Sequence, residues 1–258
     1  MRNLRILLLM LPVLFYQCKS SKNLAKNKVK PMEIYLCIGQ SNMAGRGPIE
    51  AIDKDTLTNV FLFTGKENMP WEKAANPFNK YSTVRKNISM QKLSPSYGFA
   101  KTISKAQPQT KIGLVVNAKG GTSIEQWKPG DTLYNEAIKQ TKKALETGGV
   151  LKGIIWHQGE ANVSKYKQYM SKITELIKAL RTDLNQPNLP FVAGQLSEDK
   201  PKRKNFNKMI LELPSKVKNT GVVTTENTQT IDNTHFDSES QRLLGKRYAE
   251  EMLKLLND

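Results

Sequence analysis

The feature that most constrains the fold is a regular alternation of short apolar runs with segments of helical periodicity. Five runs rich in branched and aromatic residues are predicted to be strands buried on both faces, at 34–38, 112–117, 153–157, 191–195 and 222–225. Helical segments lie between and after them, at 96–106, 133–146, 166–180 and from 238 onward. This order predicts an α/β fold, a three-layer sandwich with a mostly parallel five-stranded sheet covered on both sides.

Two further segments are predicted from local signals. The last helix opens with Ser238 and Gln241, which stand at the spacing of a capping box. Residues 53–95 hold one short apolar run, 60–63, among Gly, Asn, Pro and Lys, and they are expected to form a small β excursion or a long loop beside the site.

The N-terminal residues are predicted to be a targeting segment rather than part of the fold. Residues 1–18 have a basic start and an apolar stretch that is too short to span a bilayer, as in a signal peptide. Cys18 directly after this stretch is typical of a bacterial lipoprotein, and plain secretion or an uncleaved anchor are the alternatives. Residues 19–31 are a polar tether, and 32–258 form the folded domain. The prediction is therefore an exported protein, a periplasmic or outer-membrane lipoprotein, with contact to a membrane only through Cys18.

The net charge of +17 does not by itself indicate a nucleic-acid partner. Seven of these charges lie before residue 31, where there is no acidic residue, which leaves +10 for residues 31–258. The remaining lysines lie on polar helix faces and in loops, without interleaved aromatic residues, so a solvated surface is predicted and no nucleic acid. The second cysteine, Cys37, lies in an apolar run and is predicted to be a buried strand thiol that is not bonded to Cys18.

Polar clusters follow the predicted strands, at the edge where a parallel α/β sheet collects its functional groups. In the first, GQSNMAGRG at 39–47, Ser41 stands among small and amide residues. A serine at such a turn can expose its hydroxyl while nearby backbone N–H groups face an oxyanion. The motif lacks the G-x-S-x-G spacing of a nucleophile elbow, so an ordinary polar turn is the alternative.

The next two clusters offer groups that can support such chemistry. AKGGTSIEQW at 118–127 contains Gly120 and Gly121, which allow close approach of the backbone, although a tight turn also uses glycine. WHQGEAN at 156–162 contains Gln158, a candidate oxyanion donor, and Glu160, a candidate for orienting a base or a sugar hydroxyl. Hydrogen bonds within loops and helix caps are the alternative for both side chains.

The fourth cluster, IDNTHFD at 231–237, contains the best candidate for a general base. Asp232 and His235 are three residues apart, so the carboxylate can hold one imidazole nitrogen and leave the other free to accept a serine proton. The chain has only one other histidine, His157, and His235 is the better candidate because Asp232 lies within its local reach. With two distant histidines and no Walker-type loop, neither a metal nor a cofactor is predicted.

Together the four clusters resemble the motif blocks of the sialate O-acetylesterase-like domain, carbohydrate esterase family six of the SGNH-hydrolase superfamily. GQSNMAGRG, GGTSIEQWKPG, IIWHQGEAN and DNTHF occur in order at the ends of successive predicted strands, and the resemblance covers roughly residues 32–256. It implies a flavodoxin-like SGNH-hydrolase fold, acyl transfer by a serine without a cofactor, and an acetylated carbohydrate as the partner.

The resemblance also assigns roles to single residues. Ser41 corresponds to the nucleophile, His235 to the base and Asp232 to the acid that orients it, with Glu160 as the rival acid. The oxyanion would be held by backbone N–H groups of the serine and of Gly120 or Gly121.

Five further residues of these motifs are expected near the substrate or the nucleophile. Gln158 stands where much of the superfamily has an asparagine, and Gln40, Asn42 and Arg46 would shape the nucleophile turn. Trp127 is either a platform for a sugar or a packed core residue.

The function predicted in this way is a serine-dependent carbohydrate O-acetylesterase acting on acetylated plant polysaccharide such as xylan. A sialate O-acetylesterase is the alternative within the same chemistry. A non-catalytic carbohydrate-binding lipoprotein and a basic scaffold for polyanions are alternatives from other classes. The sequence predicts no oligomeric state.

Overall fold

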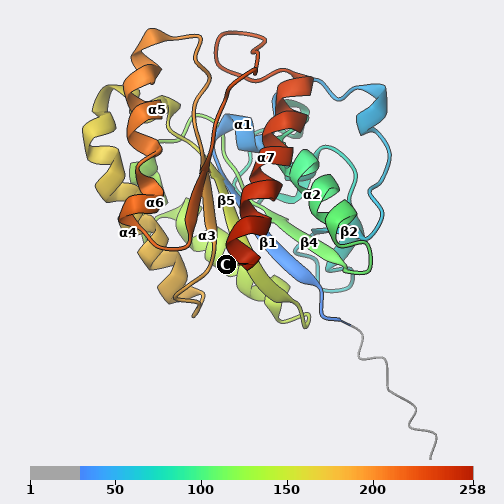
Figure 1. Cartoon of the computed structure of the whole chain (residues 1–258). Coiled ribbons are helices and arrows are strands. Elements are labelled where there is room, and N and C mark those ends of the chain that lie inside the picture. The colour runs from blue at the N-terminus through green and yellow to red at the C-terminus, as the bar shows by residue number, and fades with distance from the viewer. Residues whose placement is uncertain (1–29, 258) are drawn as a thin grey trace, which may run out of the picture.

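The computed structural model describes residues 30–257, which form a seven-stranded sheet between two layers of helices (Figure 1). The strand order is β3-β2-β4-β1-β5-β6-β7, and every neighbouring pair is parallel except β2 and β3. The strands are β1 (Glu33–Gly39), β2 (Val60–Phe63), β3 (Trp71–Lys73), β4 (Ile112–Val116), β5 (Val150–His157), β6 (Phe191–Gly194) and β7 (Thr220–Val223).

The predicted signal peptide at 1–18, its candidate lipidation site Cys18, and the tether up to residue 29 lie outside the described residues. Each helix of the described part is too short or too polar to cross a membrane. Cys37 is a free thiol with no exposed surface, as the apolar run around it predicts.

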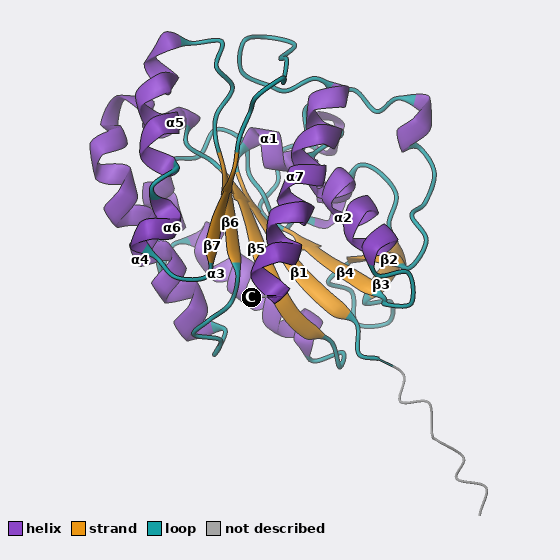
Figure 2. Ribbon diagram, in the orientation of Figure 1, coloured by secondary structure: helices purple, strands orange, loops and turns teal. Residues whose placement is uncertain are grey.

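Helices cover both faces of the sheet, and Figure 2 shows the strands fanning out between them. The carboxyl end of β1 leads into the short helix α1, and β5 leads into a 3₁₀ turn before α4. The α-helices are α1 (Ser41–Ala44), α2 (Pro95–Ala106), α3 (Thr132–Leu145), α4 (Tyr166–Asp183), α5 (Lys204–Ile210), α6 (Leu213–Lys216) and α7 (Ser238–Asn257). Short 3₁₀ helices lie at Ala51–Asp53, Phe78–Tyr81, Ile88–Met90, Ile124–Trp127, Glu160–Lys165 and Pro201–Arg203.

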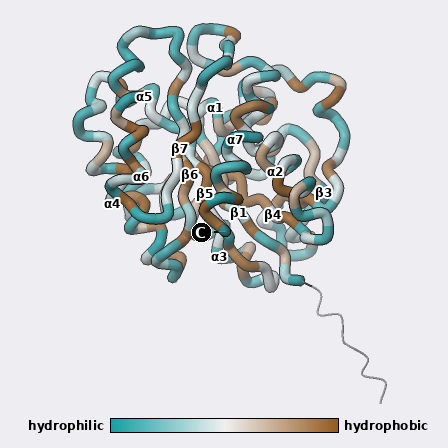
Figure 3. Tube along the Cα trace, viewed as in Figure 1, coloured by the Kyte–Doolittle hydropathy of each residue, from teal (hydrophilic) through white to brown (hydrophobic). Residues whose placement is uncertain are grey.

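The central strand β1 separates two hydrophobic cores, because successive side chains of a strand point to opposite faces. Ile34, Leu36 and Ile38 pack into the core shared with α3, α4 and α5. Tyr35 and Cys37 pack into the core shared with α2 and α7. Apolar residues accordingly concentrate along the strands and the inner helix faces (Figure 3). A strand buried on both faces lies at the centre of the sheet, which places the residue after β1 in the middle of its carboxyl edge.

The prediction of an α/β sandwich is confirmed, but the predicted number of five strands is wrong. The apolar run at 60–63, expected to form a small β excursion or a long loop, is β2, which belongs to the main sheet, pairs in parallel with β4 and buries Val60 and Leu62. Trp71–Lys73 then adds β3 as an antiparallel edge strand. Both strands are short and lie in irregular surroundings, so the periodicity of the sequence did not identify them as strands of the main sheet.

Two local predictions near the C-terminus also differ from the structure. The last strand, β7, runs from Thr220 to Val223 rather than over 222–225. Helix α7 is capped by Asp237, whose Oδ1 accepts the Ser240 N–H at 2.8 Å, rather than by a capping box of Ser238 and Gln241. The Gln241 side chain points into the protein instead and donates to Asn42 Oδ1 at 3.4 Å.

Candidate active site

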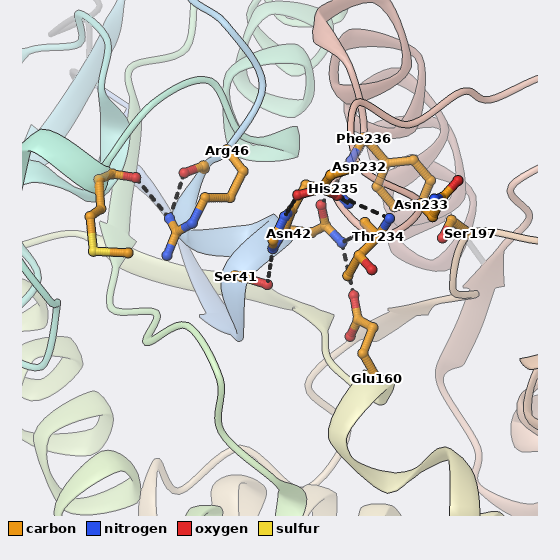
Figure 4. Close-up of polar contacts among 12 residues, drawn as sticks. Ser41, Asn42, Arg46, Glu160, Ser197, Asp232, Asn233, Thr234, His235 and Phe236 are labelled. Carbon is orange, nitrogen blue, oxygen red and sulfur yellow. Dashed lines mark hydrogen bonds and ion pairs between the residues drawn. The ribbon is translucent and has the colours of Figure 1, made fainter. Parts of the chain in front are cut away.

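Three side chains from the two ends of the domain meet at the carboxyl edge of the sheet (Figure 4). His235 Nε2 lies 3.0 Å from the Oγ of Ser41, and His235 Nδ1 lies 2.6 Å from Asp232 Oδ2. Both distances are those of hydrogen bonds, so the imidazole links the hydroxyl to the carboxylate. This is the arrangement in which a histidine can take the serine proton while the acid fixes its tautomer.

The position of Ser41 follows from the way β1 ends. Gly39 has a φ of +140° and lies so close to its partner strand that a Cβ there would be 2.2 Å from the carbonyl oxygen of His157. Only glycine fits this close approach. The chain then turns at Gln40 into α1, and Ser41, with 6% of its surface exposed, is the first residue of that helix. The serine is therefore fixed at the centre of the sheet edge rather than on a mobile loop.

The loop that carries His235 is shaped by the acid itself. Asp232 Oδ1 accepts the backbone N–H groups of Thr234 and His235, at 3.1 and 2.7 Å. The Ile231 N–H donates to the His235 carbonyl at 2.8 Å, which closes the loop. Partial burial acts to raise the pKa of Asp232, but the hydrogen bonds from the His235 backbone N–H and imidazole outweigh it and hold the pKa below its usual value. The carboxylate is therefore ionised at neutral pH.

Glu160, the rival acid, is not in contact with His235. Its Oε1 accepts a hydrogen bond from Asn42 Nδ2 at 2.8 Å, and Asn42 lies next to Ser41 in the chain. Figure 4 shows the Glu160 carboxylate pointing toward the Asn42 amide. Of the two candidate acids, the structure therefore places Asp232 on the imidazole and Glu160 on an amide.

The glycine pair of the second motif lies against the serine. A Cβ at Gly120 would be 3.4 Å from the Cβ of Ser41 and 2.6 Å from Nη2 of Arg46. The absence of a side chain at this position lets the Gly120 backbone lie against Ser41 and leaves room for the Arg46 guanidinium. Gly121 has a φ of +74° and forms the turn that follows. The structure thus brings the second motif to Ser41.

Two glutamines expected near the substrate are buried beneath the site. Gln158 is 1% exposed, and its Nε2 donates to Gln40 Oε1, to the Thr122 carbonyl and to Asn162 Oδ1, at 3.2, 3.0 and 2.8 Å. Its Oε1 accepts the Tyr169 hydroxyl at 2.8 Å. The side-chain N–H groups of Gln158 are thus engaged within the protein, where they join the first three motifs.

The second histidine is structural. His157 has no exposed surface, and its Nδ1 donates to the Tyr248 hydroxyl at 3.0 Å, because that hydroxyl in turn donates to the Trp156 carbonyl. Its Nε2 is buried and has no hydrogen-bond partner among the described residues. Burial lowers the pKa of His157, so the ring is neutral at neutral pH. His235 is the histidine that reaches the serine.

Trp127 is a packed core residue. Its ring has no exposed surface, and it lies edge-on to Trp156 with the ring centres 5.2 Å apart. The alternative that Trp127 forms a platform for a sugar is therefore wrong. Within residues 30–257 there is also no group of three or more metal-ligating side chains of His, Cys, Asp or Glu.

One residue that holds the histidine loop was missed by the sequence analysis. Arg203 is 3% exposed and donates to the Asn233 carbonyl and the Thr234 hydroxyl, both at 3.0 Å. It lies in the basic run KPKRKNF, where it cannot be distinguished from surface lysines by its neighbours. Buried arginines are rare, but burial is not visible in such a run.

The irregular segment before α2 holds the second motif in place. Asn79 exchanges two hydrogen bonds with the backbone of Ala118, each 3.0 Å long. The Ser82 hydroxyl and the Thr83 N–H both donate to Asn117 Oδ1 at 2.9 Å. The segment therefore lies beside the site, as expected, and fixes the turn that precedes Gly120.

The chain is similar to known proteins in both sequence and structure. Residues 31–254 match the family model described as carbohydrate esterase, sialic acid-specific acetylesterase. The chain is 30% identical over 184 residues to a probable carbohydrate esterase of Arabidopsis thaliana, an alignment that covers 65% of this chain and 70% of the relative. An X-ray structure from Arabidopsis thaliana superposes with a TM-score of 0.78 at 28% identity, over 87% of this chain and 98% of the other.

Two bacterial structures show the same fold at lower identity. A structure described as a novel carbohydrate acetylesterase from Xanthomonas citri has a TM-score of 0.63 at 20% identity, over 87% of this chain and 56% of the other. A carbohydrate acetylesterase from Sinorhizobium meliloti has a TM-score of 0.52 at 14% identity, over 86% of this chain and 99% of the other.

The chain belongs to this carbohydrate esterase family, with its α/β fold of the SGNH-hydrolase type. It is a carboxylic ester hydrolase of the carbohydrate acetylesterase class. The resemblance of the four sequence motifs to this family is thereby confirmed.

Proposed function

We propose that the protein is a serine-dependent O-acetylesterase that removes acetyl groups from sugar hydroxyls, with Ser41 as nucleophile, His235 as general base and Asp232 as the orienting acid. The observation that carries the proposal is the 3.0 Å contact between His235 Nε2 and the Ser41 hydroxyl, with Asp232 on the other ring nitrogen at 2.6 Å. A hydroxyl and an imidazole from opposite ends of the chain in this arrangement form an activated nucleophile.

The proposed reaction has two steps. Ser41 Oγ attacks the acetyl carbonyl carbon while its proton passes to His235 Nε2, and the proton then goes to the departing sugar oxygen as the ester bond breaks. A water molecule attacks the acetyl-serine, gives its proton to His235, and releases acetate as Ser41 recovers its hydrogen. Asp232, ionised because of its lowered pKa, stabilises the imidazolium in both steps.

Backbone N–H groups are the proposed oxyanion donors. The N–H of Ser41 stands at the start of α1, and the turn of Gly120 and Gly121 lies beside the Ser41 side chain. The buried hydrogen bonds of Gln158 favour these backbone groups over its side chain as donors. One such donor contributes about 3 kcal/mol to lowering the barrier.

The substrate we propose is an acetylated plant polysaccharide such as xylan. The acetyl group must come to a serine on the rim of the sheet, where His235 keeps 24% and Asp232 49% of its side-chain surface exposed. Such an open rim suits an acetyl group carried by a long chain of sugars, which a closed pocket does not admit.

A sialate O-acetylesterase is the second candidate, favoured by cationic groups beside the nucleophile. Arg46 Nη1 donates to the carbonyls of Gly45 and Met90, at 2.6 and 2.9 Å, while its Nη2 lies beside Gly120. Within residues 30–257 Arg46 forms no ion pair. An unpaired guanidinium at this place suits a sugar that carries a carboxylate.

The mechanism is tested by hydrolysis of 4-nitrophenyl acetate by the wild type and by the variants Ser41→Ala, His235→Ala and Asp232→Ala. We expect Ser41→Ala and His235→Ala to lower kcat by roughly four orders of magnitude or more. Activity retained in Ser41→Ala would reject the mechanism. If the wild type itself released no acetate, the alternatives of a non-catalytic carbohydrate-binding protein and of a polyanion-binding scaffold would remain.

The substrate is tested by measuring acetate release from acetylated xylan and from O-acetylated sialic acid under the same conditions. A higher kcat/KM on xylan supports the first candidate, and a higher value on sialic acid supports the second. In the second case Arg46→Gln should raise KM on the sialic acid and leave KM on 4-nitrophenyl acetate unchanged, because only the former carries a carboxylate.

We also propose that the protein is exported and anchored through a lipid on Cys18. The sequence pattern of residues 1–18 supports this, and the polar residues 19–31 would connect the anchor to the folded domain. The intact mass of the exported protein tests it: a mature chain that begins at acylated Cys18 supports the anchor, and one without lipid indicates plain secretion.

A further inference from the structure

We propose that Glu160 is a positioning residue that acts on the triad through Asn42, by fixing the orientation of the amide that joins the nucleophile turn to the histidine loop. This inference rests on the proposed serine mechanism. It assigns a purpose to a half-buried carboxylate that is next to the site and touches neither Ser41 nor His235.

Asn42 connects three parts of the chain. It has no exposed surface, and its Nδ2 donates to Glu160 Oε1 at 2.8 Å and to the Thr234 carbonyl at 3.1 Å. Its Oδ1 accepts the backbone N–H of Phe236 at 3.1 Å. Thr234 and Phe236 flank His235, so one amide holds the backbone on both sides of the base (Figure 4). Because Asn42 directly follows Ser41, the same amide fixes the histidine loop relative to the nucleophile.

The amide can do this in only one of its two orientations. A rotation of the Asn42 amide by half a turn would place Oδ1 against the Thr234 carbonyl and Nδ2 against the Phe236 N–H, so both bonds would become repulsive contacts. Glu160 Oε1 accepts the hydrogen bond that Nδ2 donates at 2.8 Å, and the rotated amide would turn Oδ1 toward it instead. Glu160 therefore stabilises the orientation in which Nδ2 faces it, and that is the orientation that holds the loop.

The contacts of Glu160 agree with a role limited to this amide. Its second oxygen, Oε2, is buried and receives no hydrogen bond from the described residues, so Asn42 is the side chain that holds the carboxylate. The acid on the imidazole is Asp232, at 2.6 Å, and the Asp232 loop closes through its own backbone bonds. The hydrogen bond between Asp232 and His235 therefore does not depend on Glu160. In this proposal Glu160 affects the distance between His235 and Ser41.

The first test is a double-mutant cycle on kcat for 4-nitrophenyl acetate with Glu160→Ala, Asn42→Ala and the double variant. We expect Glu160→Ala to lower kcat by about 10- to 100-fold, because a displacement near 1 Å is enough for such a loss, with KM changed less than about twofold. In the Asn42→Ala background, Glu160→Ala should cost nothing further, since its partner is gone. Equal losses in both backgrounds would overturn the proposal, as would full activity of Glu160→Ala.

Conservative substitution provides a second readout. In Glu160→Gln the side-chain carbonyl can still accept from Asn42, so we expect kcat to recover to within about fivefold of the wild type. A glutamine as inactive as the alanine would show that the acid itself is required and would contradict the proposal. Glu72→Ala is the matched control. Glu72 is also a hydrogen-bonded carboxylate, with Lys80 and Tyr81 as its partners, but it lies on the edge strand β3.

A spectroscopic readout keeps the proposal testable if Asn42→Ala does not fold. The proton on His235 Nδ1, shared with Asp232 across 2.6 Å, should give a strongly downfield ¹H resonance. We expect this resonance to persist in Glu160→Ala, despite the lower kcat, and to be lost in Asp232→Asn. Its loss in Glu160→Ala would overturn the proposal. Retained activity in Ser41→Ala would instead reject the serine mechanism, so the two failures are distinguishable.

Discussion

Replacement of His157 by asparagine should make the stability of the protein less sensitive to acid. In the folded protein His157 has no exposed surface, and burial lowers the pKa of its ring. In the unfolded chain the same imidazole is in water and has a pKa of about 6.5. Below that pH the unfolded state binds a proton that the folded state does not, so the free energy of unfolding decreases as the pH falls.

The size of this effect follows from the linkage relation. An imidazole that stays neutral in the folded state, and titrates at about 6.5 in the unfolded state, lowers the free energy of unfolding by about 1 kcal/mol between pH 6.5 and 5.5. Asparagine cannot take up a proton, and its amide N–H can replace Nδ1 as the donor to Tyr248. His235 is the one other histidine of the chain and is present in both proteins, so its contribution cancels in the comparison.

The assay is urea unfolding followed by tryptophan fluorescence at pH 6.5 and 5.5, for the wild type and His157→Asn. The asparagine variant is expected to be less stable at both pH values, because it leaves a cavity. Its decrease between the two pH values should nevertheless be about 1 kcal/mol smaller than that of the wild type, equivalent to about 3 °C in the melting temperature. Equal decreases would refute the reasoning, because they would mean that His157 accepts a proton in the folded protein as readily as in water.

Three further predictions concern single residues. Gly39→Ala should destabilise the fold by about 3 kcal/mol or more in urea unfolding, because its Cβ would be 2.2 Å from a backbone oxygen of β5, and an unchanged midpoint would contradict that geometry. Trp127→Phe should lower the melting temperature and leave KM for acetylated xylan unchanged, whereas a raised KM would indicate that Trp127 does contact the sugar. Arg203→Ala should lower kcat about tenfold by releasing Asn233 and Thr234 from the guanidinium, and unchanged kinetics would show that the histidine loop holds itself.

The sandwich was predictable because its signal is distributed over the whole chain. Each central strand is apolar on both alternations, and the long helices carry continuous apolar faces, so many residues agree on one arrangement. Strands β2 and β3 were not predicted as part of the main sheet, because four and three residues are too few for a periodicity to emerge. Strand β2 is placed by its pairing with β4, a contact distant in sequence, and β3 is placed in turn by its pairing with β2.

The contact between Asp232 and His235 was predictable for a different reason. Asp232 and His235 are close in sequence, so their contact depends only on local chain geometry, and the chain offers only one other histidine. Their meeting with Ser41 follows from the rule that functional residues gather at the carboxyl edge of a parallel sheet. Arg203 had no comparable signal, because its burial depends on a loop thirty residues further along the chain.

The amides of the motifs show where sequence reasoning ends. Gln40 and Asn42 flank Ser41 in the first motif and Gln158 lies in the third, and all three are expected near the substrate or the nucleophile on that ground. In the structure all three are at most 3% exposed, and each bonds to another motif. The sequence alone does not distinguish a polar side chain that contacts a ligand from one that contacts a neighbouring loop.

This difference matters for how the site achieves its geometry. Buried amides must have their hydrogen bonds satisfied, so a network of them admits one arrangement and strongly disfavours displaced ones. Gln158 ties the first motif to the second and third, and Asn42 ties the first to the third and fourth. Four loops that are independent in sequence thereby become one rigid body. The 3.0 Å contact between Ser41 and His235 is then a property of that body rather than of either residue.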